Sequence, residues 1–309
     1  MKKYLYITLI ILWIFSSFSP ICHATTFKFH LSSREDVRFL YLEPGDVLAD
    51  VQGCPAFSEV GIDQCLLKLA QHFSPMRDKV ERRTLANALS KQSDASLQLA
   101  LSSAAQKAGQ AYRNFRYDTC NRLSYSAVGS RWRASRSIWA CQFWLDLRRR
   151  SLLREAVGDA PLPIRPGRNR PRGPYRLADL WYTVGTGPDQ LENLRFQEVL
   201  SLQRLQRAKL RVQRVLDDWD EYQDFVDKAA RDFHRSGPAF LHYRKAQCED
   251  YTPKLAAALA FGPSPEAAAI ACRTLLNVEE ATLLRFFFDN HTLMSQSHRG
   301  PGHSRGDRR

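Results

Sequence analysis

The sequence predicts a mainly α-helical protein of two cystine-stapled helical modules, preceded by one short β-hairpin. Three observations lead to this fold class. Apolar residues recur at helical spacing along most of the chain. The stretch 240–286, with two cysteines, has a weaker copy of itself at 112–153. Six of the seven cysteines remain once an N-terminal signal segment is set aside, and an even count is typical of disulfide-bonded exported proteins.

Residues 1–24 are predicted to be a secretory signal peptide. Lys2 and Lys3 precede an apolar run over 5–18, and Pro20 ends it before a cleavage site after Ala24. The apolar run is too short for a stable transmembrane anchor. We therefore expect a periplasmic or secreted protein with no membrane span after cleavage.

Residues 25–157 are expected to form the N-terminal module. Its first part, 25–49, has an alternating polar and apolar segment from Thr26 and a β-branched and aromatic segment from Val37, which favours a hairpin. A helix is predicted from Asp63 to Phe73, and one or two long helices between Met76 and Cys120, with a polar break at 90–96.

Residues 158–189 are expected to be a linker. Five prolines fall between Pro161 and Pro174 and exclude a regular helix, while four arginines make the segment basic. Such a segment is either a solvated spacer or an electrostatic tether to a polyanion.

Residues 190–295 are expected to form the C-terminal module. The longest helical pattern runs from Gln190 to Arg235, and we expect Ser236-Gly237-Pro238 to interrupt it. The motif at 240–286 then predicts helix, cysteine, loop, cysteine and helix. Residues 296–309 have no large apolar side chain after Ser297 and are expected to be a disordered basic tail.

The repeat also predicts the disulfides. An aromatic residue and an arginine precede the first cysteine in each copy, as Phe115-Arg116 and as Tyr243-Arg244, and the second cysteine follows 21 or 24 residues later. Six cysteines allow 15 pairings. The repeat selects Cys120–Cys141 and Cys248–Cys272, which leaves Cys54–Cys65. No Cys-x-x-Cys or His-x-x-x-His spacing favours a metal site instead.

The positive net charge fits either an anionic partner or a surface whose charge serves solubility alone. The chain has a formal net charge of +13, and loss of Lys2 and Lys3 would leave +11. The expected loop between Cys120 and Cys141 mixes cations with aromatic rings, which suits a polyanion surface. In the alternative, Trp139 packs in the core and the arginines are solvated. The cations and rings of this loop are Arg122, Arg131, Arg133, Arg136, Tyr125, Trp132 and Trp139.

The segment from Phe240 to Leu284 resembles the LprI-like lysozyme-inhibitor domain of bacterial envelope proteins. The residues that carry the resemblance are Phe240, Tyr243, Arg244, Cys248, Cys272, Leu276 and Leu284. Near the family's later arginine position stand Arg149 in the first copy and Glu280 in the second. The resemblance implies export, a small helical bundle held by cystines, and lysozyme binding in some members.

Two functional hypotheses follow. The first is an exported envelope protein that inhibits a lysozyme or binds a cell-wall component, with Arg116 and Arg244 as candidate contacts. The second is a basic protein that binds lipopolysaccharide, acidic lipid or, less favoured, nucleic acid, with Trp132, Arg133 and Arg136 as candidates. Both arginines of the repeat could also pack within their own helices. No catalytic constellation is recognisable, so we expect neither an enzyme nor a cofactor.

Overall fold

The computed structural model describes residues 59–128, 131–156, 180, 187–219, 223–259 and 263–297. All secondary structure in these ranges is helical, with no strand, which confirms the mainly α fold class. The predicted hairpin, Cys54, the five prolines from Pro161 to Pro174 and the basic tail after Ser297 lie outside the described residues.

Each copy consists of the same series of helices. The first comprises α4 (Glu59–Leu89), α5 (Ala95–Arg116), the π-helix η1 (Tyr117–Leu123), α6 (Ser124–Val128) and α7 (Arg131–Ala156). The second comprises α9 (Gln190–Asp217), α10 (Gln223–Arg244), the π-helix η2 (Lys245–Tyr251), α11 (Thr252–Leu259) and α12 (Pro265–Ser297). The repeat found in the sequence is therefore a repeat of the fold.

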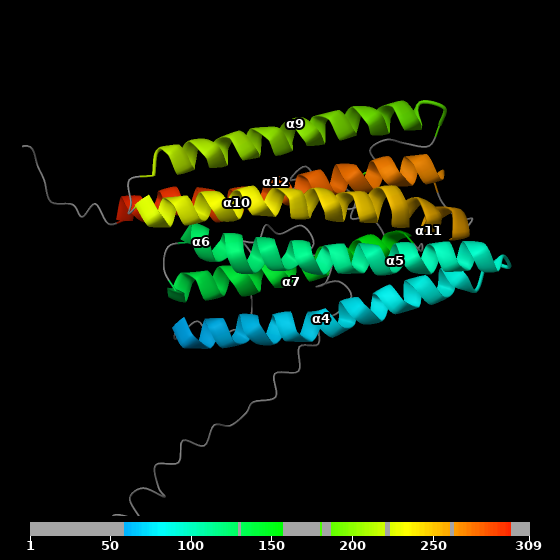
Figure 1. The fold of residues 1–309 in the computed structure, drawn as a ribbon, viewed down its shortest axis with the longest axis horizontal. Coiled ribbons are helices and arrows are strands. Elements are labelled where there is room, and N and C mark those ends of the chain that lie inside the picture. The colour runs from blue at the N-terminus through cyan, green and yellow to red at the C-terminus, as the bar shows by residue number, and fades with distance from the viewer. Residues whose placement is uncertain are drawn as a thin grey trace, which may run out of the picture.

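The two copies pack side by side with reciprocal contacts. In Figure 1, α4 and α9 lie at opposite edges and run in opposite directions, as do α5 and α10 in the middle. Helix α4 packs on α7 and α9 packs on α12, while α5 contacts η2 and α10 contacts η1. This exchange of equivalent contacts is what a pseudo-twofold axis between two copies of one unit requires.

Aromatic residues of α5 and α10 form the centre of this interface. Phe115 stacks on Tyr243, its counterpart in the second copy, with ring centroids 5.4 Å apart. The reciprocal pairs Tyr112–Tyr243 and Phe115–Phe240 have centroid distances of 5.4 and 5.6 Å. All four rings are buried. Each such pair contributes roughly 0.5–1.5 kcal/mol beyond the burial of its area.

The predicted break at 90–96 is confirmed, because α4 ends at Leu89 and α5 begins at Ala95. Asp94 caps α5: its carboxylate accepts hydrogen bonds from the backbone N–H groups of Ser96 and Leu97, at 2.7 and 3.4 Å. The bonds from Ser96 lower the pKa of the Asp94 carboxyl. The polar segment therefore ends one helix and starts the next.

The predicted interruption at Ser236-Gly237-Pro238 is wrong. Helix α10 continues through Pro238 to Arg244, and the Ser236 hydroxyl bonds to the Phe233 carbonyl at 2.8 Å. The break comes earlier, after Asp217, where Asp218 caps α9. Helix α9 thus ends at two acidic residues, whose negative charge is unfavourable near the C-terminal end of the helix dipole.

The predicted loops between the paired cysteines are also largely wrong. In the first copy, this span is occupied by η1, α6 and the start of α7; in the second, by η2, α11 and the start of α12. Residues 129–130 and 260–262, between those helices, are not described. The first cysteine of each pair, Cys120 or Cys248, thus lies in a π-helical turn. The sequence pattern does not predict these π turns.

Candidate functional site: a basic–aromatic surface

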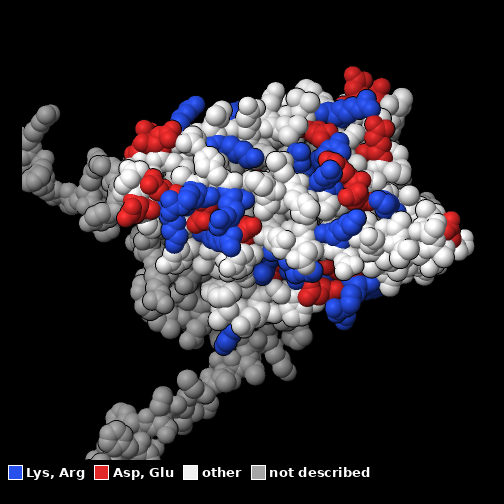
Figure 2. Space-filling view, in the orientation of Figure 1, with Lys and Arg blue, Asp and Glu red and all other residues white. Residues whose placement is uncertain are grey.

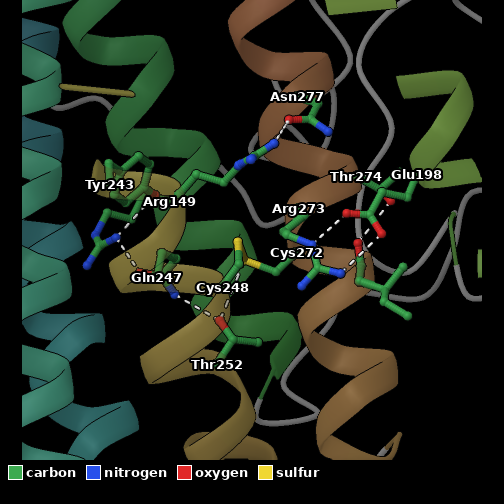
Figure 3. The surroundings of a disulfide bond; sticks show 12 residues. Arg149, Glu198, Tyr243, Gln247, Cys248, Thr252, Cys272, Arg273, Thr274 and Asn277 are labelled. Atoms are coloured by element: carbon green, nitrogen blue, oxygen red, sulfur yellow. Dashed lines mark hydrogen bonds and ion pairs between the residues drawn. A yellow bond between two sulfur atoms is a disulfide. The ribbon is translucent and has the colours of Figure 1, made fainter. Parts of the chain in front are cut away.

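The two predicted cystines inside the repeats are present. Cys120 is bonded to Cys141 and Cys248 to Cys272, with Cα–Cα distances of 5.5 and 5.4 Å. In both copies the backbone N–H that follows the π-helix reaches back five residues, from Ser124 to Thr119 and from Thr252 to Gln247. Figure 3 shows how η2 lays Cys248 against α12, where Cys272 meets it. The π turn and the cystine together fix α5 to α7, and α10 to α12.

The repeat arginines Arg116 and Arg244 have structural partners. Arg116 donates to a carboxylate oxygen of Asp146 at 3.0 Å, five residues beyond the second cysteine. Arg244 donates to the side-chain oxygen of Asn277 at 2.9 Å, at the same position of the second copy. Each therefore ties its helix to the helix of the second cysteine. This geometry favours the packing alternative for both residues.

Asp146 collects a larger set of donors than Asn277 does. Besides Arg116, it accepts from Ser74 at 2.7 Å, from Tyr112 at 2.7 Å and from Arg77. Burial and the adjacent Asp146 carboxylate raise the pKa of the Tyr112 hydroxyl well above its usual value. The carboxylate is fully buried. It is thus held by charge-assisted hydrogen bonds inside the first copy.

Arg148 and Arg149 reach from the first copy into the second. Arg148 donates to Glu279 at 2.7 Å, and these two residues occupy equivalent positions of the repeat. Arg149 contacts Glu81 in its own copy and donates to Tyr243 at 3.2 Å and Gln247 at 2.8 Å in the other. Burial raises the pKa of Tyr243 to about 12. These polar contacts align the two copies.

A cationic and aromatic surface lies where α6 meets the first half of α10. We call it the basic–aromatic surface and define it by Tyr117, Arg122, Tyr125, Lys228 and Arg231. Tyr117 and Tyr125 are 53% and 42% exposed. The guanidinium carbon of Arg122 lies 5.2 Å from the centre of the Tyr117 ring, and the Lys228 ammonium lies 4.6 Å from that of Tyr125. Figure 2 shows blue groups gathered around a smaller red group in this region.

The acidic groups nearby are engaged by side chains of the same region. Asp118 accepts from Arg122 at 2.8 Å, Asp232 accepts from the Ser126 hydroxyl, and Asp227 accepts from Gln223 at 2.8 Å. Lys228 and Arg231 are exposed on one face of α10, three residues apart. Arg122 is paired with Asp118, so Lys228 and Arg231 are the cations of this surface that can meet an anion, beside half-exposed rings that can pack on a sugar or another flat group.

The second copy does not repeat this surface. Tyr117 and Arg122 correspond to Lys245 and Asp250 when the two copies are aligned on their first cysteines, and Tyr125 corresponds to Pro253. Equivalent helices thus present aromatic rings and cations in the first copy, and the ion pair between Lys254 and Asp250 in the second. The surface is a property of the first copy together with α10.

The sequence pattern predicted part of this surface. Arg122 and Tyr125 belonged to the predicted cationic and aromatic loop, and Trp139 of that loop is partly buried against the core. Trp132, Arg133 and Arg136 lie in the first turns of α7, where the structure does not describe side chains. Tyr117, Lys228 and Arg231 were missed, because their contacts bring separate helices together. The π turn beside Tyr117 has no simple sequence pattern.

No protein family, curated protein or solved structure gives a significant match to the chain. The resemblance to the LprI-like domain therefore stays a prediction. Within the ranges that the structure describes, no helix is long and apolar enough to cross a membrane. Among the same residues, no three His, Cys, Asp or Glu side chains are grouped as metal ligands.

Proposed function

We propose that this chain is an exported binding protein that takes an anionic polymer of the cell envelope on its basic–aromatic surface. The observation that carries the proposal is the pair of half-exposed tyrosines, each with a cation over its ring. Phosphate or carboxylate groups would meet Lys228 and Arg231, and sugar rings would pack on Tyr117 and Tyr125. The signal-like N-terminus, the two cystines and the net charge of +13 support an exported protein with such a ligand.

Lipopolysaccharide is the probe we would use first, with isothermal titration at low and physiological salt. We expect saturable binding that weakens with salt, since counterions compete for the cations. The double variant Arg122→Ala/Lys228→Ala should bind at least tenfold more weakly, and Tyr125→Ala should weaken binding at physiological salt. Lys254→Ala, which removes an exposed cation from α11, is the matched control and should bind like the unmodified protein.

Equal affinity of the single variants Lys228→Ala and Lys254→Ala, which remove one positive charge each, would reject the surface, because binding would then follow net charge alone. Thermal unfolding of each variant shows whether its fold is intact. The substituted side chains are exposed or partly exposed, so we expect unchanged unfolding temperatures.

Lysozyme inhibition is the second candidate, supported by the resemblance and by the cystine that closes each copy. Arg116 and Arg244 would not be the residues that insert into the lysozyme cleft, because both are hydrogen-bonded within the helical bundle. Lysis of cell walls by a c-type lysozyme, measured with and without the oxidised protein, tests this candidate. Inhibition at a fixed stoichiometry that survives physiological salt would favour it over polymer binding.

A further inference from the structure

Helix α9 has an apolar outer face with no partner among the described residues. Half of the large hydrophobic side chains that are exposed in the described structure lie on this one helix: Phe196, Val199, Leu200, Leu202 and Leu210. Phe196 is 59% exposed and Leu210 is 51% exposed. The opposite face of α9, with Leu194, Leu205 and Val212, is buried against α12. Figure 1 shows α9 at the outer edge of the bundle.

The spacing of this outer face is that of a coiled-coil seam. Steps of three and four residues connect Phe196, Val199, Gln203, Gln206 and Leu210, which we call the α9 stripe, and all five are exposed. A repeat of three and four residues is the pattern by which one helix packs along another. Over this length the stripe spans about 21 Å at 1.5 Å per residue.

The charges beside the middle of the stripe are positive. Arg207 and Arg214 follow one side of it, and on the other side Arg195 is paired with Glu266 of α12 at 2.8 Å. The acidic residues Glu192 and Asp217 lie beyond the two ends of the stripe. Between Glu198 and Asp217 the helix has no acidic residue, and Glu198 itself is paired with Arg273 at 2.5 Å on the α12 side. Flanking positions of this kind select the charge of the partner helix. A partner helix must therefore bring carboxylates.

A second copy of the chain fits this surface poorly. A parallel pair of α9 helices joined along their stripes would bring Arg207 and Arg214 of one chain close to the same cations of the other. Juxtaposed like charges oppose association, and the chain as a whole has a net charge of +13.

A lipid surface also fits less well than a helix. Gln203 and Gln206 lie in the middle of the stripe, where hydrocarbon would leave their amides without hydrogen-bond partners. A partner helix can hydrogen-bond to them, and a single polar position in a seam is a common way to fix register.

From this surface we infer that α9 docks an acidic amphipathic helix of another protein. The apolar side of that helix packs on Phe196, Val199 and Leu210, and its flanking carboxylates meet Arg207 and Arg214. The docking surface is separate from the basic–aromatic surface and does not depend on the function proposed for it.

The test uses two synthetic four-heptad peptides with leucine and isoleucine along the seam. One has glutamate at all flanking positions, and the other has lysine. We expect the oxidised protein to bind the glutamate peptide saturably with one-to-one stoichiometry, and to bind the lysine peptide at least tenfold more weakly, by fluorescence anisotropy. Phe196→Ser/Leu210→Ser should weaken binding of the glutamate peptide at least tenfold. Arg207→Glu/Arg214→Glu should reverse the preference between the peptides.

Leu99→Ser is the matched control, because Leu99 is 73% exposed on α5, away from the stripe. It should leave peptide binding unchanged, as should Arg122→Ala/Lys228→Ala, which separates this surface from the one proposed for polymer binding. Equal binding of both peptides, or no effect of the α9 substitutions, would overturn the inference. Binding to phosphatidylglycerol vesicles in place of the peptide would overturn it in favour of a lipid surface. A dimer that the α9 substitutions dissociate would overturn it in favour of a second copy of the chain.

Discussion

Asp146 and Asn277 occupy equivalent positions of the repeat, but one side chain is a charged carboxylate and the other a neutral amide. Both accept a hydrogen bond from the repeat arginine of their own copy, and both bond to a serine of the first helix of that copy, Ser74 or Ser201. Only Asp146 is charged, and it neutralises a second arginine, Arg77. The first copy therefore depends on a buried charge network, whereas the second uses neutral acceptors.

We predict that Asp146→Ala destabilises the protein more than Asn277→Ala does. The first substitution leaves the Arg116 guanidinium without a carboxylate and Arg77 with only the partly exposed carboxylates of its own helix α4, and breaking a buried pair in this way costs about 3–5 kcal/mol. The second removes hydrogen bonds from a neutral side chain, which costs about 1–3 kcal/mol. Urea unfolding followed by far-ultraviolet circular dichroism measures both. Equal losses would contradict the assignment of a charge network to the first copy.

Glu280 is a buried carboxyl at the position where the first copy has Arg149. It is 1% exposed, and its Oε2 atom has no hydrogen-bond partner among the residues that the structure describes. Burial raises the pKa of the Glu280 carboxyl to about 7, although Lys209 on α9 lowers it. The unfolded chain loses this proton near pH 4.5, whereas the folded chain keeps it until about pH 7.

We predict that stability falls as the pH rises from about 4.5 to 7, because the folded state binds the proton more tightly than the unfolded state does. For Glu280 alone the loss is about 3 kcal/mol across this range. Glu280→Gln should abolish that part of the pH dependence and be the more stable protein at pH 8. The control is Glu266→Gln, an exposed carboxyl. Parallel pH profiles for Glu280→Gln and the unmodified protein would contradict this account.

At the scale of elements, the features that the sequence could predict were those with a local pattern. Repeated cysteines and aromatic–arginine pairs predicted both described cystines, and Asp94 with its polar neighbours predicted the break before α5. The break predicted at Pro238 is absent, because α10 accommodates this proline within a helix that is packed along its length. The π turns at Cys120 and Cys248 have no periodicity of their own and could not be predicted.

The surfaces were harder to predict than the helices. Phe196, Val199 and Leu210 belong to the apolar helical pattern of the sequence over 190–235, together with Leu205. The structure shows that α9 buries the side that bears Leu205 and leaves Phe196 in solvent. The basic–aromatic surface combines Tyr125 of α6 with Lys228 of α10, which are far apart in the chain. Only the packing of the helices decides which cation lies over which ring.

At the scale of the whole molecule, the central claim is that the two copies form one folded unit. Phe115 contacts Phe240 and Tyr243, and Arg149 connects Glu81 with Gln247. The core is correspondingly continuous, since one cluster of buried residues includes side chains from both copies. Neither copy could expose its aromatic face without losing this burial.

The measurement that tests this claim most directly is hydrogen exchange of the oxidised protein with and without Phe115→Ala, read by mass spectrometry. Truncation of a fully buried phenylalanine costs about 3–5 kcal/mol. If the copies unfold as one unit, peptides from α5 and from α10 lose protection by the same free energy. A loss confined to the first copy, with α10 and η2 as protected as before, would contradict the claim and show two modules that fold separately.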